Sequence, residues 1–248
     1  MNTRIKVLVI TIIFILFLSE ISYAEPEIPL IEGIIGDEPG DYVFSIQLLI
    51  ILTILTLAPS ILIMMTSFTR IVIVLSFIRN ALGMQQTPPN QIIIGLALFL
   101  TFYIMAPVGQ IISDEAIKPY INEEIDFTQA LDNAMEPIRE FMFKQTRNKD
   151  LALFLNISEI GQAESLDDIP NYVLIPAFII SELKTAFQIG FVIYIPFLII
   201  DMVVSSTLMS MGMMMLPPVI ISLPFKILLF ILVDGWNLVA KSLVLGFN

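Results

Sequence analysis

The chain has 248 residues, 57% hydrophobic and 14% charged, with a mean hydropathy of +0.90, whereas soluble domains are about 45–50% apolar and about 25% charged. This composition predicts a membrane protein, and the net charge of −11 argues against nucleic acid as a partner. The absence of cysteine and histidine removes the commonest metal ligands and the commonest catalytic base, so we expect no enzyme, no metal and no cofactor.

The N-terminal residues 1–24 have the pattern of a secretory signal peptide. Arg4 and Lys6 precede a short apolar run, and a small residue, Ala24, stands before Glu25-Pro26. The run is shorter than the roughly 20 residues that a membrane span needs. An uncleaved anchor helix is the alternative. Residues 25–42 then form an acidic lead-in.

Residues 43–112 are predicted to form a first apolar helical hairpin. Two uncharged stretches flank a segment whose only charges are Arg70 and Arg79, and Gly83 and then Pro88-Pro89 end the helix that carries them. Short loops rich in basic residues stay in the cytoplasm. We therefore place Arg70 and Arg79 in a cytoplasmic loop.

Residues 113–172 are the one stretch that looks soluble, with thirteen acidic and five basic residues. Leu131, Met135, Ile138 and Met142 repeat at intervals of three and four, which predicts an amphipathic helix. By the same topology argument, the stretch is a small helical periplasmic domain. The predicted fold is thus an all-α membrane protein of two apolar hairpins with this domain between them.

Residues 173–248 are predicted to form the second apolar hairpin, which four ionisable side chains interrupt: Glu182, Lys184, Asp201 and Lys226. Ionisable groups inside a membrane usually face a partner or a water-filled path. One interpretation is that Glu182 and Lys184 cap a short span, with the lysine reaching the interface. The sharper hypothesis is an ion pair between Lys226 and either Glu182 or Asp201, within a subunit or between neighbours.

The turn of this second hairpin is the segment LMSMGMMMLPP, residues 208–218. Gly212 and Pro217-Pro218 interrupt a regular helix, so we expect a loop. A loop is normally polar, yet this one is uncharged and rich in methionine, an adaptable apolar residue. The methionines either fill a core between helices or form a soft constriction where several copies converge. Under the second hypothesis, the gate is lined by Met209, Met211, Met213, Met214 and Met215.

Two long stretches resemble the conserved blocks of the FliP family, which includes virulence-system homologues of the SctR and YscR type. Residues 66–107 begin with TSFTRIVIVLSFIRNALGMQQTPPNQ, and residues 182–236 contain LMSMGMMMLPP between apolar runs. The signal peptide and the long middle domain resemble the flagellar branch. The resemblance covers residues 43–245.

The resemblance implies a core subunit of the type III export gate in the bacterial inner membrane, at the flagellar basal body. Family members assemble as a pentamer with FliQ and FliR around a pore for unfolded export substrates, and FlhB and FlhA join that apparatus. Their methionine-rich loop acts as a gasket. The family complex is lifted largely toward the periplasm, so apolar helices are expected to contact one another as well as membrane lipid.

Other functions compete with this expectation. The chain could serve the virulence branch of the family, or it could be an ion or proton carrier that uses Glu182, Lys184 and Asp201 as a relay. A third possibility is an assembly scaffold without a role in conduction. A carrier is expected to repeat its site in two halves, and the sequence has no matching pair of acidic, Gly/Pro-broken segments.

Overall fold

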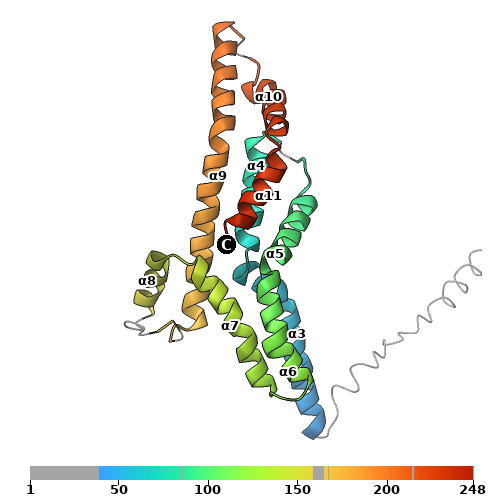
Figure 1. Cartoon of the computed structure of the whole chain (residues 1–248). Helices are drawn as coiled ribbons and strands as arrows, with labels where there is room; N and C mark the ends of the chain where they lie inside the picture. Colours follow the sequence, from blue (N-terminus) through green and yellow to red (C-terminus); the bar gives the residue numbers. More distant parts are fainter. Residues whose placement is uncertain (1–38, 85, 159–164, 167, 214, 248) are drawn as a thin grey trace, which may run out of the picture. The chain divides into compact units, whose positions relative to one another are not determined.

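The computed structural model describes residues 39–84, 86–158, 165–166, 168–213 and 215–247. The predicted signal peptide and most of the acidic lead-in lie outside these residues. Every regular element within the described residues is a helix, as Figure 1 shows. The prediction of an all-helical chain is therefore confirmed for this part of the protein.

The chain divides into two compact units, residues 1–57 and 58–248. Helix α3 (Pro39–Met65) begins in the first unit and carries Pro59 in its interior. Many of the described large apolar side chains of α3 in the first unit are exposed, including Leu49 and Leu55. An uncharged surface of this kind suits contact with lipid.

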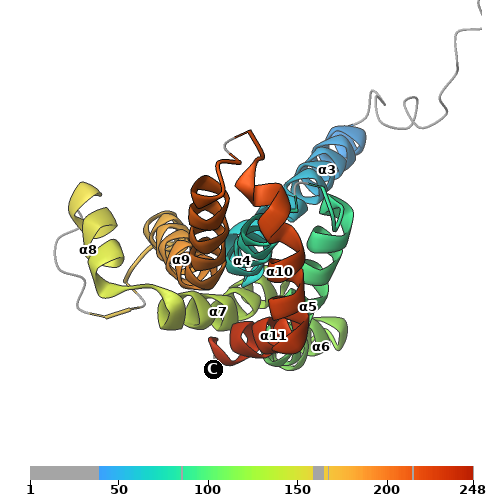
Figure 2. The ribbon, with the colours of Figure 1, turned by 90° about the horizontal axis from the view of Figure 1, so that it is seen from above.

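The second unit is built around α4 (Phe68–Ala81), which packs most extensively against α9 (Asn171–Ser210) and next against α5 (Asn90–Ile112). Helices α10 (Pro218–Leu232) and α11 (Gly235–Leu245) complete the enclosure of α4, as the view in Figure 2 shows. Helix α4 is therefore an interior helix.

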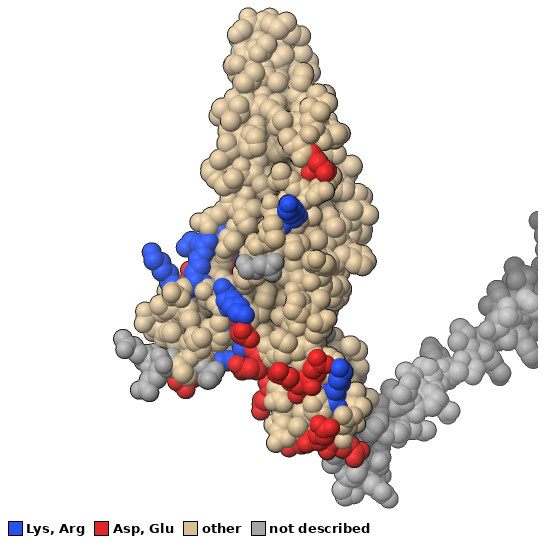
Figure 3. Space-filling view, viewed as in Figure 1, with Lys and Arg blue, Asp and Glu red and all other residues tan. Residues whose placement is uncertain are grey.

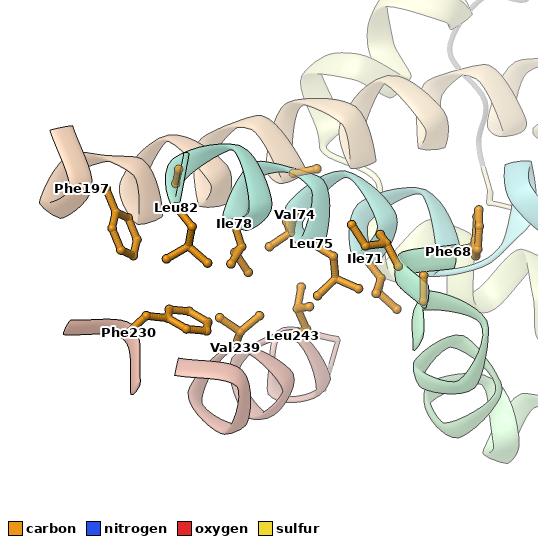
Figure 4. Packing of buried hydrophobic residues seen from close by; sticks show 14 residues of the cluster. Phe68, Ile71, Val74, Leu75, Ile78, Leu82, Phe197, Phe230, Val239 and Leu243 are labelled. Atoms are coloured by element: carbon orange, nitrogen blue, oxygen red, sulfur yellow. The ribbon is translucent and has the colours of Figure 1, made fainter. Parts of the chain in front are cut away.

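The core follows the spacing of apolar residues along α4. Ile71, Val74, Leu75 and Ile78 recur at intervals of three and four and are fully or almost fully buried. Figure 4 shows them facing Phe230, Val239 and Leu243 from α10 and α11.

A glycine sets the close approach of α4 and α9. A Cβ atom added at Gly190 would lie 2.6 Å from the Phe77 ring, so only glycine leaves room for that ring. Phe77 in turn meets the edge of Phe187, with the ring centroids 5.3 Å apart.

Residues 113–157 of the acidic stretch fold as four short or medium helices: the π-helix η1 (Ser113–Ile117), α6 (Lys118–Ile121), α7 (Phe127–Gln145) and α8 (Asn148–Ile157). Asp126 caps α7, because its carboxylate accepts the Gln129 N–H at 2.8 Å and the Gln129 side chain accepts in return. Both α7 and α8 contact α9.

The amphipathic pattern of α7 is only partly used in packing. Met142 is fully buried, and Met135 and Ile138 pack against a second core that contains Phe141, Leu174 and Phe178. Leu131, which shares the spacing, is exposed. The apolar face of α7 thus extends beyond the contact that the described residues provide.

Among the described residues, two continuous helical stretches are long and apolar enough to cross a membrane, Asn90–Ile121 and Asn171–Ser210. Helices α10 and α11 together form a third candidate, bent by 61°. Residues 68–81 fold as helix α4, which ends just before Gly83, as the sequence predicts. Arg70 and Arg79 both lie on this helix, and their cytoplasmic placement stays a prediction.

Candidate functional site

The methionine-rich turn joins α9 to α10. Helix α9 ends at Ser210 because Gly212 takes a left-handed backbone conformation, with a φ of 73°. The Met213 N–H donates to the Leu208 carbonyl at 3.0 Å, and the Gly212 N–H donates to the Met209 carbonyl at 3.0 Å. This paired arrangement is a Schellman motif. Residues 211–217 then connect to Pro218 at the start of α10.

The methionines of this turn are open to their surroundings. The exposed fractions of Met209, Met211, Met213 and Met215 are 63%, 68%, 42% and 98%. Met214 lies outside the described residues. Met209 belongs to the last turn of α9, whereas the other three described methionines follow the helix. Among the residues that the structure describes, these side chains do not fill a core between helices.

An ion pair joins the two arms of the hairpin that carries the turn. Lys226 Nζ on α10 lies 2.6 Å from Asp201 Oδ2 on α9, and the Ser222 hydroxyl donates to Asp201 Oδ1 at 2.5 Å. Lys226 is 2% exposed and Asp201 is 25% exposed. Both oxygens of the carboxylate therefore have donors from α10, and the pair holds the arms together below the turn.

A second ion pair lies deeper. Arg70 on α4 donates through Nε to Glu182 Oε2 on α9 at 2.9 Å, and a second guanidinium nitrogen donates to Oε1. The Arg70 side chain is 5% exposed and that of Glu182 is fully buried. This two-point geometry is the strong form of an arginine–carboxylate contact. The sequence interpretation proposed Lys226 as a partner for Glu182 or Asp201, and the structure brings Lys226 to Asp201.

Arg70 also fixes the C-terminal end of α11. Its remaining donors bind the Gly246 carbonyl and the Gln145 side chain, each at 2.9 Å. The Phe247 ring lies 3.8 Å from Arg70 Cζ, where it stacks against the guanidinium. One buried side chain thus connects α4, α7, α9 and the residues after α11.

The remaining predicted charges lie apart from both pairs. Lys184 is exposed on α9. Arg79 lies near the end of α4 and donates to the Asn90 side chain at 2.5 Å and to the Pro88 carbonyl at 3.3 Å. Glu182, Lys184 and Asp201 therefore do not gather in one place, which a proton relay would require.

Sequence reasoning did not identify Asp150, a buried acid of α8. Its carboxylate accepts the Ser181 hydroxyl at 2.8 Å, and Ser181 Oγ accepts the Arg147 N–H at 3.0 Å. This network docks the α7–α8 turn on α9. Asp150 follows Arg147 and Lys149 in a stretch dense in charge, so nothing in its local pattern distinguishes it from a solvated side chain.

Comparison with known proteins places the chain in a family. The model of the FliP family matches residues 51–243, which include both ion pairs and the methionine turn. The chain belongs to the FliP family. A flagellar biosynthetic protein FliP of Bacillus subtilis (strain 168) is 62% identical over 86% of this chain and 96% of its own length.

Two further FliP relatives are similar over most of the chain. The flagellar biosynthetic protein FliP of Aquifex aeolicus (strain VF5) is 54% identical over 90% of this chain and 93% of its own length. That of Pectobacterium carotovorum subsp. carotovorum is 55% identical over 83% of this chain and 80% of its own length.

Proposed function

We propose that the chain is a pore-forming subunit of the flagellar type III protein export gate. FliP family membership and the names of the relatives support a component of the flagellar export apparatus and favour the flagellar over the virulence branch. The long apolar helices support a membrane location, and we place it in the bacterial inner membrane at the flagellar basal body.

The exposed methionine turn is the observation that carries the pore hypothesis. Met211, Met213, Met215 and Leu216 present apolar side chains that the described part of the chain does not cover, and contact with neighbouring copies would cover them. Methionine is flexible and polarizable, so a ring of such turns closes against ions and deforms around an unfolded polypeptide. In the proposed gate, Met209, Met211, Met213, Met214 and Met215 form this gasket.

The two ion pairs support the gasket because they fix the helices that carry the methionine turn. The Asp201–Lys226 pair ties the two arms of the hairpin together, and the Arg70–Glu182 pair anchors α9 to the core. Each loop is then presented at the end of a fixed hairpin. Because both acids are paired with cations, the arrangement favours a structural role for them over a carrier relay.

The assembly belongs to the same proposal. We propose a pentamer of this chain with FliQ and FliR around the export path, and contact with FlhB and FlhA. Residues 113–172 lie in the periplasm in this arrangement. Single cysteines at Lys118 and Lys149 test that topology, because they should react with an impermeant thiol reagent in whole cells. Labelling only after lysis would reverse the topology.

The decisive experiment alters the turn. Cells that carry Met211→Ser, Met213→Ser and Met215→Ser should leak small solutes through an assembled gate, because serine cannot seal an apolar constriction. Met202→Ser is a matched control, since Met202 is an exposed methionine of α9 outside the turn. Normal impermeability of the triple variant, in a complex shown to be intact, would count against the gasket.

A further inference from the structure

The part of the second unit that carries the methionine turn has few charges. Figure 3 shows most acidic and basic side chains gathered towards the opposite end. Of the charges near the turn, Asp201 and Lys226 neutralise each other. Arg79 on α4 and Asp234 at the start of α11 differ from them, because among the residues that the structure describes neither belongs to an ion pair.

Arg79 is a half-buried cation with only part of its guanidinium engaged. Its Nη1 donates to the Asn90 side chain at 2.5 Å and to the Pro88 carbonyl at 3.3 Å. Its Nε is buried and has no acceptor among the described residues. Arg70 uses its Nε and a terminal nitrogen to hold Glu182. Arg79 is thus oriented in the same way as a paired arginine but lacks the carboxylate that would complete its hydrogen bonds.

Asp234 is an exposed carboxylate held in an uncommon backbone conformation. Its φ is 51°, in the left-handed region that aspartate adopts more readily than most residues. Although it occupies the N-cap position of α11, its side chain accepts no capping hydrogen bond. The next residue is tightly packed, because a Cβ atom at Gly235 would lie 2.3 Å from the Phe230 ring. The junction of α10 and α11 therefore presents a carboxylate that its own helix does not use.

Exposed apolar side chains surround this carboxylate in the sequence. They are Ile231, Leu232, Val233 and Trp236. Lipid would cover such side chains, but a lone carboxylate among them is costly in lipid. A protein surface that brings a cation can cover both the apolar side chains and the charge. The surface around Asp234 therefore favours a protein partner with a basic residue.

Arg79 and Asp234 lie at a similar level of the second unit. Figure 4 shows Leu82, three residues after Arg79, close to Phe230, four residues before Asp234. Figure 1 shows the end of α4, the start of α5 and the junction of α10 and α11 at a similar height along α9. Lys241, another exposed cation, is seven residues from Asp234, about 10 Å along α11. It therefore lies at a different level from Asp234.

We propose that Arg79 of one copy of this chain binds Asp234 of the neighbouring copy. The inference rests on the proposed ring of copies, in which the long helices run along the export path. Identical subunits related by rotation meet through two different surfaces, and a rotation keeps each residue at its own level along the axis. Two opposite charges at one level, on different elements, meet both conditions. The pair would fix the height of each methionine turn relative to the next.

Chemical linkage tests the contact directly, because the chain contains no cysteine. Arg79→Cys and Asp234→Cys are introduced together into the full chain, which is produced with FliQ and FliR. A short bis-maleimide is the reagent, since arginine and aspartate hold their Cα atoms farther apart than a disulfide spans. We expect a series of covalent multimers, because each copy reacts at both of its interfaces. Either single variant should give no product larger than a dimer.

The matched control combines Arg79→Cys with Lys241→Cys, because Lys241 is exposed on the same helix as Asp234 but at another level. It should form few multimers, and a yield equal to that of the first pair would overturn the proposal. Native mass spectrometry of the untreated complex separates the contact from the ring. An intact ring without linkage would overturn this pairing alone, whereas the absence of any ring would overturn both the pairing and the proposed function.

Exchange of the two charges tests their contribution to assembly. Asp234→Arg should lower the assembled fraction about tenfold or more, because two cations then meet at each interface. Arg79→Glu should do the same, and the two changes together should restore most of the assembly. Lys241→Glu is the control and should assemble normally. A double variant that assembles no better than the single variants would overturn the proposal.

Asp234→Asn separates the charge from the fold. Asparagine also adopts the left-handed conformation readily, so this variant keeps the junction of α10 and α11 and removes only the charge. We expect unchanged helix content by circular dichroism and a reduced assembled fraction. Normal assembly of this variant would show that the carboxylate of Asp234 does not hold neighbouring copies together.

Discussion

The two buried ion pairs in the described part of the chain differ in how many segments they join. Arg70 and Glu182 are almost completely enclosed, and Arg70 also binds the Gln145 side chain and the Gly246 carbonyl. The pair of Asp201 with Lys226 joins only α9 and α10, and Asp201 is 25% exposed. The first pair therefore holds the fold together, whereas the second sets the geometry of one hairpin.

The difference follows from how far each carboxylate is exposed to solvent and from how many hydrogen-bond donors it has. A carboxylate without water depends wholly on its protein donors, so loss of a partner leaves a charge that nothing else stabilises. A carboxylate with partial access to its surroundings retains other donors. For Asp201, the Ser222 hydroxyl at 2.5 Å is one of them.

The largest expected effect comes from Glu182→Ala. It leaves the Arg70 guanidinium buried without its carboxylate, which costs about 3–5 kcal/mol. Thermal unfolding of the purified chain in detergent, followed by circular dichroism, should show a large loss of stability, and the chain should fail to assemble. Assembly and export at the normal level would show that this pair does not hold the fold.

Lys226→Ala should have a smaller effect, about 1–3 kcal/mol, because Asp201 keeps the Ser222 hydroxyl. The same measurement applies, together with an assay of solute leakage. The double variant Asp201→Asn, Lys226→Met should recover much of the loss, since neither side chain then carries a buried charge. A double variant no more stable than Lys226→Ala would contradict the pairing.

The smallest effect is expected for Lys184→Ala. Lys184 is exposed and lies two residues from Glu182 along α9. The variant therefore tests whether the loss of stability depends on the position of a residue in the sequence or on its burial. We expect a change in unfolding free energy within about 0.5 kcal/mol. A loss as large as that of Glu182→Ala would mean that the two neighbours act together.

The sequence predicts the ionisable residues of interest better than their partners. Glu182, Asp201 and Lys226 stand out because they interrupt apolar runs. Arg70 does not, because basic residues in a short charge-poor segment also indicate a cytoplasmic loop. Its partner lies 112 positions away in the chain, and local spacing carries no information about a contact formed only when α4 packs against α9.

Local patterns succeed where the cause is local. The end of α9 before Gly212 and the start of α10 at Pro218 follow from backbone preferences of single residues. Packing is harder to predict from the sequence than helix ends are, as α7 illustrates. Met142 is buried and Leu131 is exposed, although both fit the same helical spacing. The signal peptide and the periplasmic position of residues 113–172 stay predictions.

Helix α9 has a mechanical consequence. It runs without interruption from the level of Glu182 to Ser210, about 42 Å at 1.5 Å per residue. A lever of that length, tilted by about 5° at its anchored level, moves its far end by about 4 Å, the distance between two packed carbon atoms. Because α7 and α8 contact the near end of α9, a molecule that binds those helices would, in the proposed gate, widen or narrow the constriction without touching it.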